Sequence, residues 1–361
     1  MVIYVLAIII SIFFAFLAEN VRRQYNNNKT NKLKISYIIL CVLSFLPPFL
    51  VSGFRDYSVG TDTSGTYKEI YNVVLYGGDG IRDFGYAFLN RIAIWLFDGY
   101  YGLLIITSFI FCALSFKSIF SESKYPTLSV ILFFATNLYF LSMNMIRQSI
   151  AISIFILSIP HIKNKSFFKF LFLNLIAVSI HSITVIYFII YFLLNRRIKI
   201  NHIIIVCLVV AIFGSLFSSE LIEFLCSFSY FRKYFAWYFT SQFATGELNL
   251  FSLLINVFIL LFLIAINKSA KDDKDYNNLL CLETLSVVSL LLSPCLPMMQ
   301  RISWLFSFPI YIYLPKMFDY ISDKRIRRIT QICVVLCFII YMVITTFVRG
   351  YNEVVPYTSI F

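Results

Sequence analysis

The sequence predicts an all-α protein with many membrane-spanning helices, and two observations carry that prediction. Hydrophobic residues make up 60% of the 361 residues and charged residues only 13%, against the roughly 25% charged residues of soluble domains. Apolar runs of roughly 17–25 residues recur along the chain, and each is long enough to cross a bilayer. Because the runs are continuous and not alternating, they indicate helices and exclude a β-barrel.

Hydropathy predicts twelve spans, a number compatible with a GT-C-like architecture. They cover residues 2–18, 33–52, 100–118, 126–142, 147–160, 167–180, 182–194, 203–219, 250–266, 279–295, 301–316 and 329–348. The first run has neither a basic segment nor a cleavage site typical of a signal peptide, so we expect it to be retained as a span. The stretches 126–160 and 167–194 can each also be read as one kinked helix.

Lysine and arginine set the predicted orientation. Six connections that alternate along the chain contain 21 of the 30 Lys and Arg residues, namely 21–34, 117–124, 161–169, 195–199, 267–274 and 316–328. Positive residues stay on the cytoplasmic side, so both termini are predicted to be exterior. Reading 126–160 as one span would break this alternation, which favours two. The net charge of +12 therefore reflects membrane orientation and does not indicate a nucleic-acid partner.

Two longer exterior segments interrupt the predicted single membrane domain (1–361). The loop 53–99 contains "FGYAFLNRIAIWLF" (84–97), which is apolar but short and carries Arg91. A crossing here would invert all later loops, so we expect an interfacial or re-entrant helix. The loop 220–249 begins with aromatic residues interleaved with basic ones, a pattern typical of a membrane interface.

The unusual polar residues fall at the exterior ends of the predicted spans. Arg147 and Gln148 begin the fifth span, His181 joins the sixth to the seventh, and Gln300 with Arg301 begins the eleventh. An arginine at a helix centre costs ~2.5–3.5 kcal/mol on insertion scales, whereas one at a helix end can extend to the lipid headgroups. The neighbouring amides and the matching positions on two helices favour a shared polar cavity.

Simpler structural explanations exist for several of these residues. His181 could bond to a neighbouring helix, Asp62 in "GTDTSGTY" could be a turn residue, and Arg55 could form a surface pair with Asp56. The eight cysteines lie mostly in apolar runs without metal-binding spacing. With no paired-carboxylate motif on the exterior side either, we expect no metal ion and no cofactor.

Several segments together resemble a known family. The stretches "FRDYSVGTDTSGTYKEIY", "FGYAFLN", "NMIRQSIAISIFI", "SIHSITVIYF" and "QRISWLFSF" resemble, in order and spacing, the EpsG family of Wzy-like polysaccharide and O-antigen polymerases. The resemblance extends from about Gly53 to Arg301. The family's arginine-plus-GTD loop, RQ pair, HS pair and late arginine correspond here to Arg55, Gly60, Thr61 and Asp62, to Arg147 and Gln148, to His181 and Ser182, and to Arg301.

The resemblance implies an enzyme of the bacterial plasma membrane that joins undecaprenyl-pyrophosphate-linked oligosaccharide repeat units, one donor and one acceptor, at the exterior face. The product would be a capsular, extracellular or O-antigen polysaccharide. The implied partners are membrane lipid, a flippase and a chain-length regulator of the same pathway.

The chemistry of that reaction assigns roles to the candidate residues. Arg147 and Arg301 would stabilise the charge of the leaving pyrophosphate, and His181 or Asp62 would deprotonate or orient the acceptor hydroxyl. The expected substrate-binding residues are Arg55, Gly60, Thr61, Tyr67, Gln148 and Gln300.

Two other classes of function stay open at this point. A flippase or transporter for the same lipid-linked sugars would place charged sites near the midplane and often show internal repeats, whereas the polar residues here gather at one interface. A membrane acyltransferase or glycosyltransferase that modifies the same glycan is the other alternative.

Overall fold

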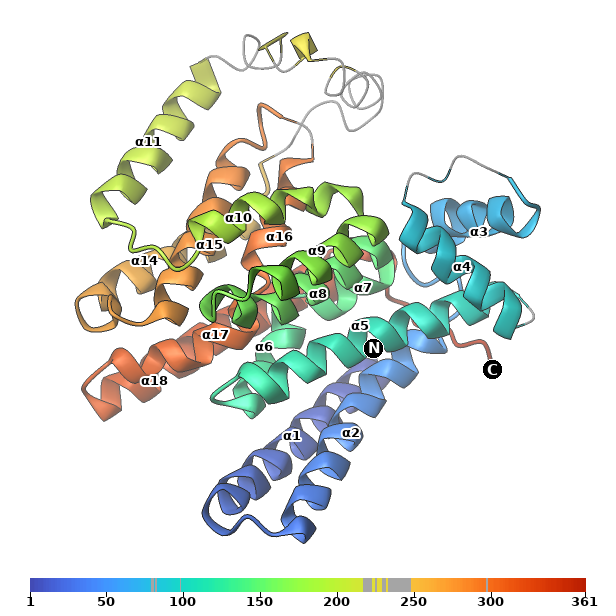
Figure 1. Cartoon of the computed structure of the whole chain (residues 1–361), viewed down its shortest axis with the longest axis horizontal. Helices are drawn as coiled ribbons and strands as arrows, with labels where there is room; N and C mark the ends of the chain where they lie inside the picture. The colour runs from blue at the N-terminus through green and yellow to red at the C-terminus, as the bar shows by residue number, and fades with distance from the viewer. Residues whose placement is uncertain are drawn as a thin grey trace. The chain divides into compact units, whose positions relative to one another are not determined.

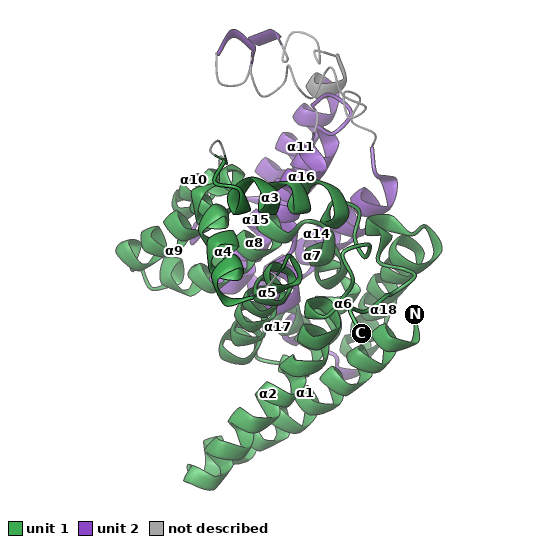
Figure 2. Ribbon diagram, turned by 90° about the vertical axis from the view of Figure 1, so that its right-hand side faces the viewer, with its two compact units in different colours: residues 1–192, 314–318, 325–361 green, residues 193–313, 319–324 purple. Residues whose placement is uncertain are grey.

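The computed structural model describes residues 1–78, 81, 83–97, 99–216, 223–224, 226–228, 232, 248–296 and 298–361. It divides into two compact units, shown in Figure 2: unit 1 (residues 1–192, 314–318 and 325–361) and unit 2 (193–313 and 319–324). The named elements of the described residues are all helical, as predicted. The single membrane domain stays a prediction, and the predicted loop 220–249 lies mostly outside the described residues.

Helices follow one another along the described residues (Figure 1). Unit 1 contains, apart from single terminal residues, α1 (Val2–Asn28), α2 (Asn31–Gly53), η1 (Thr63–Tyr67), α3 (Lys68–Leu75), α4 (Phe84–Leu96), α5 (Tyr101–Glu122), α6 (Pro126–Ala135), α7 (Leu138–Asn144), α8 (Ile146–Lys163), α9 (Phe167–Ile180), η2 (Ser182–Ile186), α10 (Tyr187–Leu193), α18 (Lys324–Met342), η4 (Val343–Val348) and η5 (Tyr351–Glu353). Unit 2 contains α11 (Ile200–Leu216), α14 (Leu250–Ala270), α15 (Lys274–Leu291) and α16 (Met299–Ser307). The segments α17 (Ile310–Met317) and η3 (Phe318–Tyr320) contain residues of both units.

Five helices of the described residues are long and apolar enough to cross a membrane: α1, α2, α5, α14 and α18 with η4. The pair α6 and α7, bent by 48°, makes a sixth if it is one broken span. The helices α9, η2 with α10, and α11 are apolar but shorter. The structure is therefore that of a polytopic membrane protein, while the count of twelve spans and the GT-C-like architecture stay predictions.

The bend between α6 and α7 is held by side chains of another segment. Asn137, between the two helices, has a left-handed backbone with φ of 66°, a conformation that asparagine tolerates better than most residues. Its amide group donates to Thr345 Oγ1 and accepts from Thr346 Oγ1 at 2.9 Å. Polar partners of this kind allow a broken helix to be buried in an apolar protein.

One end of unit 1 gathers two of the predicted cytoplasmic connections. Arg22 Nη1 donates to Ser123 O at 3.0 Å, and the hydroxyl of Tyr37 donates to Phe120 O at 3.1 Å. The connections 21–34 and 117–124 therefore lie together, as the alternation of charge requires.

The other end of unit 1 gathers both termini and the loop that follows α2. Tyr4 lies about 27 Å from Arg22 along α1, since a helix rises ~1.5 Å per residue, and its hydroxyl donates to Val354 O at 2.8 Å. Asp56 N donates to Thr358 O at 2.9 Å. The termini thus share one end with the loop 53–99, in agreement with the predicted topology. That this end faces the exterior stays a prediction.

Candidate active site

The GTD loop is shaped by the C-terminal tail (residues 351–361) and by the junction of α7 and α8. Gly60 N donates to Glu353 O at 3.0 Å, and Thr61 N donates to Asn352 O at 3.3 Å. Asp62 N donates to Asn144 Oδ1 at 2.8 Å. Backbone hydrogen bonds to η5 near the end of the chain therefore hold a loop that lies some 300 residues earlier in the sequence.

Gly60 is the residue that this loop requires. Its φ is +106°, and a Cβ atom here would lie 2.6 Å from Met143 O. Both the backbone conformation and the close approach to the α7 terminus exclude other residues without a shift of backbone. Gly60 thus acts as a structural residue of the loop, and its predicted contact with substrate stays a prediction.

Arg55 lies inside the protein just before this loop. Its side chain is only 1% exposed. The guanidinium donates to Met143 O and Ser108 Oγ, both at 3.1 Å, to Val59 O at 3.4 Å, and to Ser52 O. Burial lowers the pKa of Arg55, although neighbouring tyrosines oppose that effect. Through these bonds Arg55 joins α2, α5 and α7. Because Arg55 is buried, the alternative of a surface pair with Asp56 is wrong. Its predicted contact with substrate stays a prediction.

A second arginine, Arg147, lies at the start of α8 in a cluster of ionisable groups. Its Nη1 lies 2.7 Å from Asp83 Oδ2, and His181 Nδ1 lies 3.7 Å from the same oxygen. The guanidinium carbon lies 5.6 Å from the ring centroids of both Tyr67 and Tyr86, within the range of cation–π attraction. About 23% of the Arg147 side chain and 20% of the His181 side chain remain exposed. The cluster is therefore partly open.

Asp83 is the residue that brings Arg147 and His181 together. Its side chain is 4% exposed, and its second oxygen, Oδ1, accepts from Ser182 N at 3.1 Å. Burial alone would raise the pKa of Asp83, but His181 and the charge of Arg147 outweigh it and hold the pKa below its usual value. Asp83 therefore stays ionised at neutral pH and can orient a histidine ring.

The packing of α4 against α9 places Asp83 beside His181. Asp83 immediately precedes α4, and His181 immediately follows α9. A Cβ atom on Gly85 would lie 2.9 Å from Ser179 C and 2.3 Å from Ser179 Oγ. The absence of a side chain at Gly85 thus lets the two helix ends approach, which accounts for the glycine in the "FGY" segment.

Tyr67, Gln148 and Asp62 surround this cluster in different ways. Tyr67 is 4% exposed and packs edge-to-face on Tyr86 at 5.7 Å between centroids, so it contributes an aromatic wall beneath Arg147. Gln148 is buried, so its predicted contact with substrate would need a movement of the protein around it. Asp62 is half-buried and Thr61 exposed, which leaves both accessible.

Gln300 and Arg301 lie in unit 2, at the start of α16. Gln300 Nε2 donates to Ser252 Oγ on α14 at 3.3 Å. Further along the same helices, the Ser286 hydroxyl donates to Asn256 Oδ1 at 3.0 Å and lies 2.8 Å from Ser303 Oγ. A polar seam thus runs between α14, α15 and α16. The convergence of Arg301 with Arg147 and His181 stays a prediction.

Asp83 was missed in reasoning from the sequence. The loop 53–99 contains several carboxylates, and nothing in its composition distinguishes this one. A usable signal was its position immediately before the predicted helix 84–97, because an aspartate there is a frequent helix start.

The fold and the cluster together indicate the class of protein. It is a polytopic membrane protein whose described elements are all helical, with a partly open Asp–His–Arg cluster at one end of its larger unit. The sequence model of the EpsG family matches residues 38–359. The chain therefore belongs to the EpsG family, as its motifs predicted. No curated protein and no solved structure matches it.

Proposed function

We propose that the protein is a polymerase that joins undecaprenyl-pyrophosphate-linked oligosaccharide repeat units at the exterior face of the bacterial plasma membrane. Membership of the EpsG family supports a polysaccharide polymerase in general terms. The observation that carries the specific proposal is the cluster of Arg147, Asp83 and His181, because it combines an anion-binding group with an oriented base.

His181 is the proposed base. The hydroxyl of the acceptor repeat unit transfers its proton to the ring while its oxygen attacks the anomeric carbon of the donor glycan. With Nδ1 turned towards the Asp83 carboxylate, the other ring nitrogen is left to receive the proton. Asp62, the alternative base, has no comparable partner that would orient it among the described residues, so the geometry favours His181.

Arg147 is the proposed site for the leaving group. The bond between the anomeric carbon and the diphosphate breaks, and the electron pair stays on the diphosphate oxygen, whose growing charge a fixed guanidinium stabilises. Guanidinium binds phosphate through two parallel donors. Arg301 is proposed to assist from unit 2, and the reaction is proposed to need no metal ion.

The experiment compares the glycan lipids of cells that carry variants of the chromosomal gene. In Arg147→Ala and His181→Ala, protein of normal abundance in the membrane should leave lipid carriers with a single repeat unit and no long polymer. Polymer of normal length in both variants would remove the site assignment.

The same strains distinguish the polymerase from a flippase. A blocked polymerase leaves single-unit carriers at the exterior face, where an added glycosidase can reach them, whereas a blocked flippase leaves them at the cytoplasmic face. Accumulation at the cytoplasmic face would contradict the proposal. Long polymer that lacks only an acyl or single-sugar decoration would instead support the modifying transferase.

A further inference from the structure

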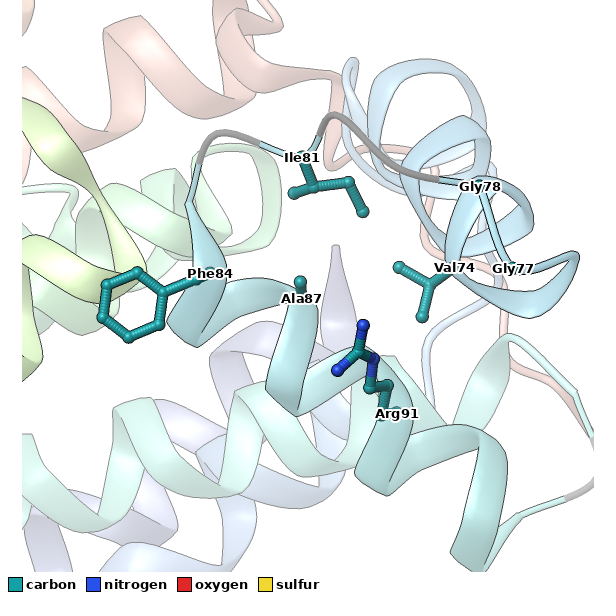
Figure 3. A pocket seen from close by; sticks show the side chains of 7 residues that line it. All are labelled: Val74, Gly77, Gly78, Ile81, Phe84, Ala87 and Arg91. Carbon is teal, nitrogen blue, oxygen red and sulfur yellow. The ribbon is translucent and has the colours of Figure 1, made fainter.

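A hollow of about 250 Å³ lies between α3 and α4, on the side of α4 away from the Arg147 cluster. Val74, Ile81 and Ala87 contribute its apolar lining, and the turn Gly77–Gly78 lies at its edge. Figure 3 shows the Arg91 side chain directed into this space. The volume is below the ~300–1,000 Å³ of pockets that enclose whole small molecules, so the hollow suits a headgroup better than a complete substrate.

Arg91 is a cation that the protein leaves available. Its side chain is exposed. Among the described residues, no acceptor forms a hydrogen bond or an ion pair with it. Arg55, by contrast, is buried and donates to four protein oxygens, and Arg147 donates from Nη1 to Asp83. A guanidinium that enters a hollow with both polar and apolar lining is a suitable ligand for a phosphate group.

The two faces of α4 have opposite character. Tyr86, Asn90 and Ala93 are fully buried, and Tyr86 is one of the two rings under Arg147. The opposite face carries Phe88 and Trp95, the latter 82% exposed, with Arg91 between them in helical spacing. Exposed aromatic residues around a cation are typical of a helix at headgroup depth. The helix therefore separates the Arg147 cluster from a face suited to lipid.

We propose that the hollow binds the diphosphate of a lipid-linked substrate through Arg91, while the isoprenoid chain of that lipid lies along Phe88 and Trp95. This inference rests on the proposed function, because polymerisation joins the glycans of two lipid-linked substrates, each with its own diphosphate, and Arg147 accounts for the diphosphate of one. The second carrier is then held on the outer face of α4, and its glycan can pass around the helix end at Asp83 towards His181. The hollow holds a lipid substrate and has no part in the proton transfer.

Trp95 supplies a direct measurement of binding that does not depend on polymerisation. The protein is purified at full length in neutral phosphatidylcholine nanodiscs, with Trp237→Phe and Trp304→Phe so that Trp95 alone reports. Farnesyl diphosphate is the probe, since it combines an isoprenoid chain with a diphosphate. We expect a saturable change in Trp95 fluorescence whose Kd rises at least tenfold in Arg91→Ala. The matched control Arg349→Ala, which removes an arginine of unit 1 outside the hollow, should bind within twofold of the parent.

Two further titrations identify the ligand. Inorganic pyrophosphate should bind at least tenfold more weakly than farnesyl diphosphate, and phosphatidylglycerol in the nanodisc should not displace it. Equal affinity of pyrophosphate would indicate a soluble-anion site, and displacement by phosphatidylglycerol would indicate general lipid contact; each overturns the proposal. An unchanged Kd in Arg91→Ala also overturns it.

A further variant distinguishes failure of the hollow from failure of the proposed function. Arg147→Ala should keep the Trp95 fluorescence response, because the cluster lies on the other face of α4. If Arg147→Ala lost the response while Arg91→Ala kept it, farnesyl diphosphate would bind at the cluster, and the proposed site in the hollow would be wrong. Normal polymer in His181→Ala, with binding at Arg91 intact, would instead contradict the polymerase mechanism and leave the lipid site standing.

Discussion

Arg55 and Arg147 both contact the region where α7 meets α8, yet their surroundings differ in every respect that decides function. Arg55 is 1% exposed and donates to backbone carbonyls and a serine, and no carboxylate of the described residues pairs with it. Arg147 is partly exposed, pairs with Asp83 and lies over two tyrosine rings. Arg55 therefore holds three helices together, whereas Arg147 is held in place by Asp83 and stays partly accessible from outside the protein.

The difference shows how one residue type serves two purposes at the same end of a membrane protein. Carbonyl oxygens satisfy a guanidinium in an apolar interior without adding a charge that could attract further groups. The Asp83 carboxylate pairs with the guanidinium and lies 3.7 Å from an imidazole nitrogen, and both of these side chains remain partly accessible. We therefore expect Arg55 variants to lose the fold and variants of the cluster to lose the reaction.

The largest expected effect is that of Arg55→Met. This change removes the donors to Ser52 O and Met143 O. Met143 O keeps the bond from Thr63 Oγ1, but a buried acceptor left without a partner costs about 1–3 kcal/mol. We expect little protein in the membrane and a strongly lowered melting temperature in detergent, measured by fluorescence-detected size exclusion after heating. Arg147→Lys is the matched control, because it keeps a cation beside the buried Asp83 carboxylate, and it should melt close to the parent. Equal melting of the two variants would contradict the contrast between the two arginines.

Deletion of residues 351–361 should have the next largest effect. The tail supplies the acceptors for Asp56 N, Gly60 N and Thr61 N, so its loss frees the GTD loop. We expect polymer to be abolished and the melting temperature to fall by less than in Arg55→Met. Replacement of the tail by a Gly/Ser segment of equal length is the control for chain length. The Gly/Ser tail keeps backbone carbonyls, so normal polymer with it would show only that the side chains of the tail are not needed. Normal polymer in the deletion itself would show that these hydrogen bonds are not needed.

Asp83→Asn should lower polymerisation strongly while the fold is retained. The amide keeps the shape but removes the charge that pairs with Arg147 and faces His181, and the loss of an oriented base lowers a rate by about 10²–10⁴-fold. Asp83→Glu, which restores the charge, should recover part of the activity. Chain-length distributions of the glycan give the measurement. Activity of Asp83→Asn equal to that of the parent would remove Asp83 from the site.

Arg147→Lys should give the smallest defect of the series. Lysine keeps the charge but not the planar pair of donors, so we expect shorter chains and not their absence. A ladder of glycan lengths resolved by gel electrophoresis would measure the shift. Wild-type chain lengths in this variant would show that charge alone suffices at this position.

Much of the fold could be predicted because its signals are local. A long run of apolar residues indicates a membrane helix from its own composition. The basic residues of the connections 21–34 and 117–124 predicted that both lie at the same end of the protein, and the hydrogen bond from Arg22 to Ser123 O confirms that they do. The family, too, followed from short motifs in order. The break at Asn137 was not predicted, because its conformation depends on Thr345 and Thr346, more than 200 residues later.

The sequence by itself determined the class of protein, the family and two of the three members of the cluster, Arg147 and His181, since each stands out against apolar neighbours. Only the tertiary structure decided that Asp83 joins them, that Arg55 is sealed inside, and that the end of the chain shapes the GTD loop. The reason is physical: the preference of a residue for membrane or water acts where it stands, whereas a hydrogen bond needs a partner that packing brings from elsewhere. Asp83 meets its partners only because Gly85 lets α4 approach α9.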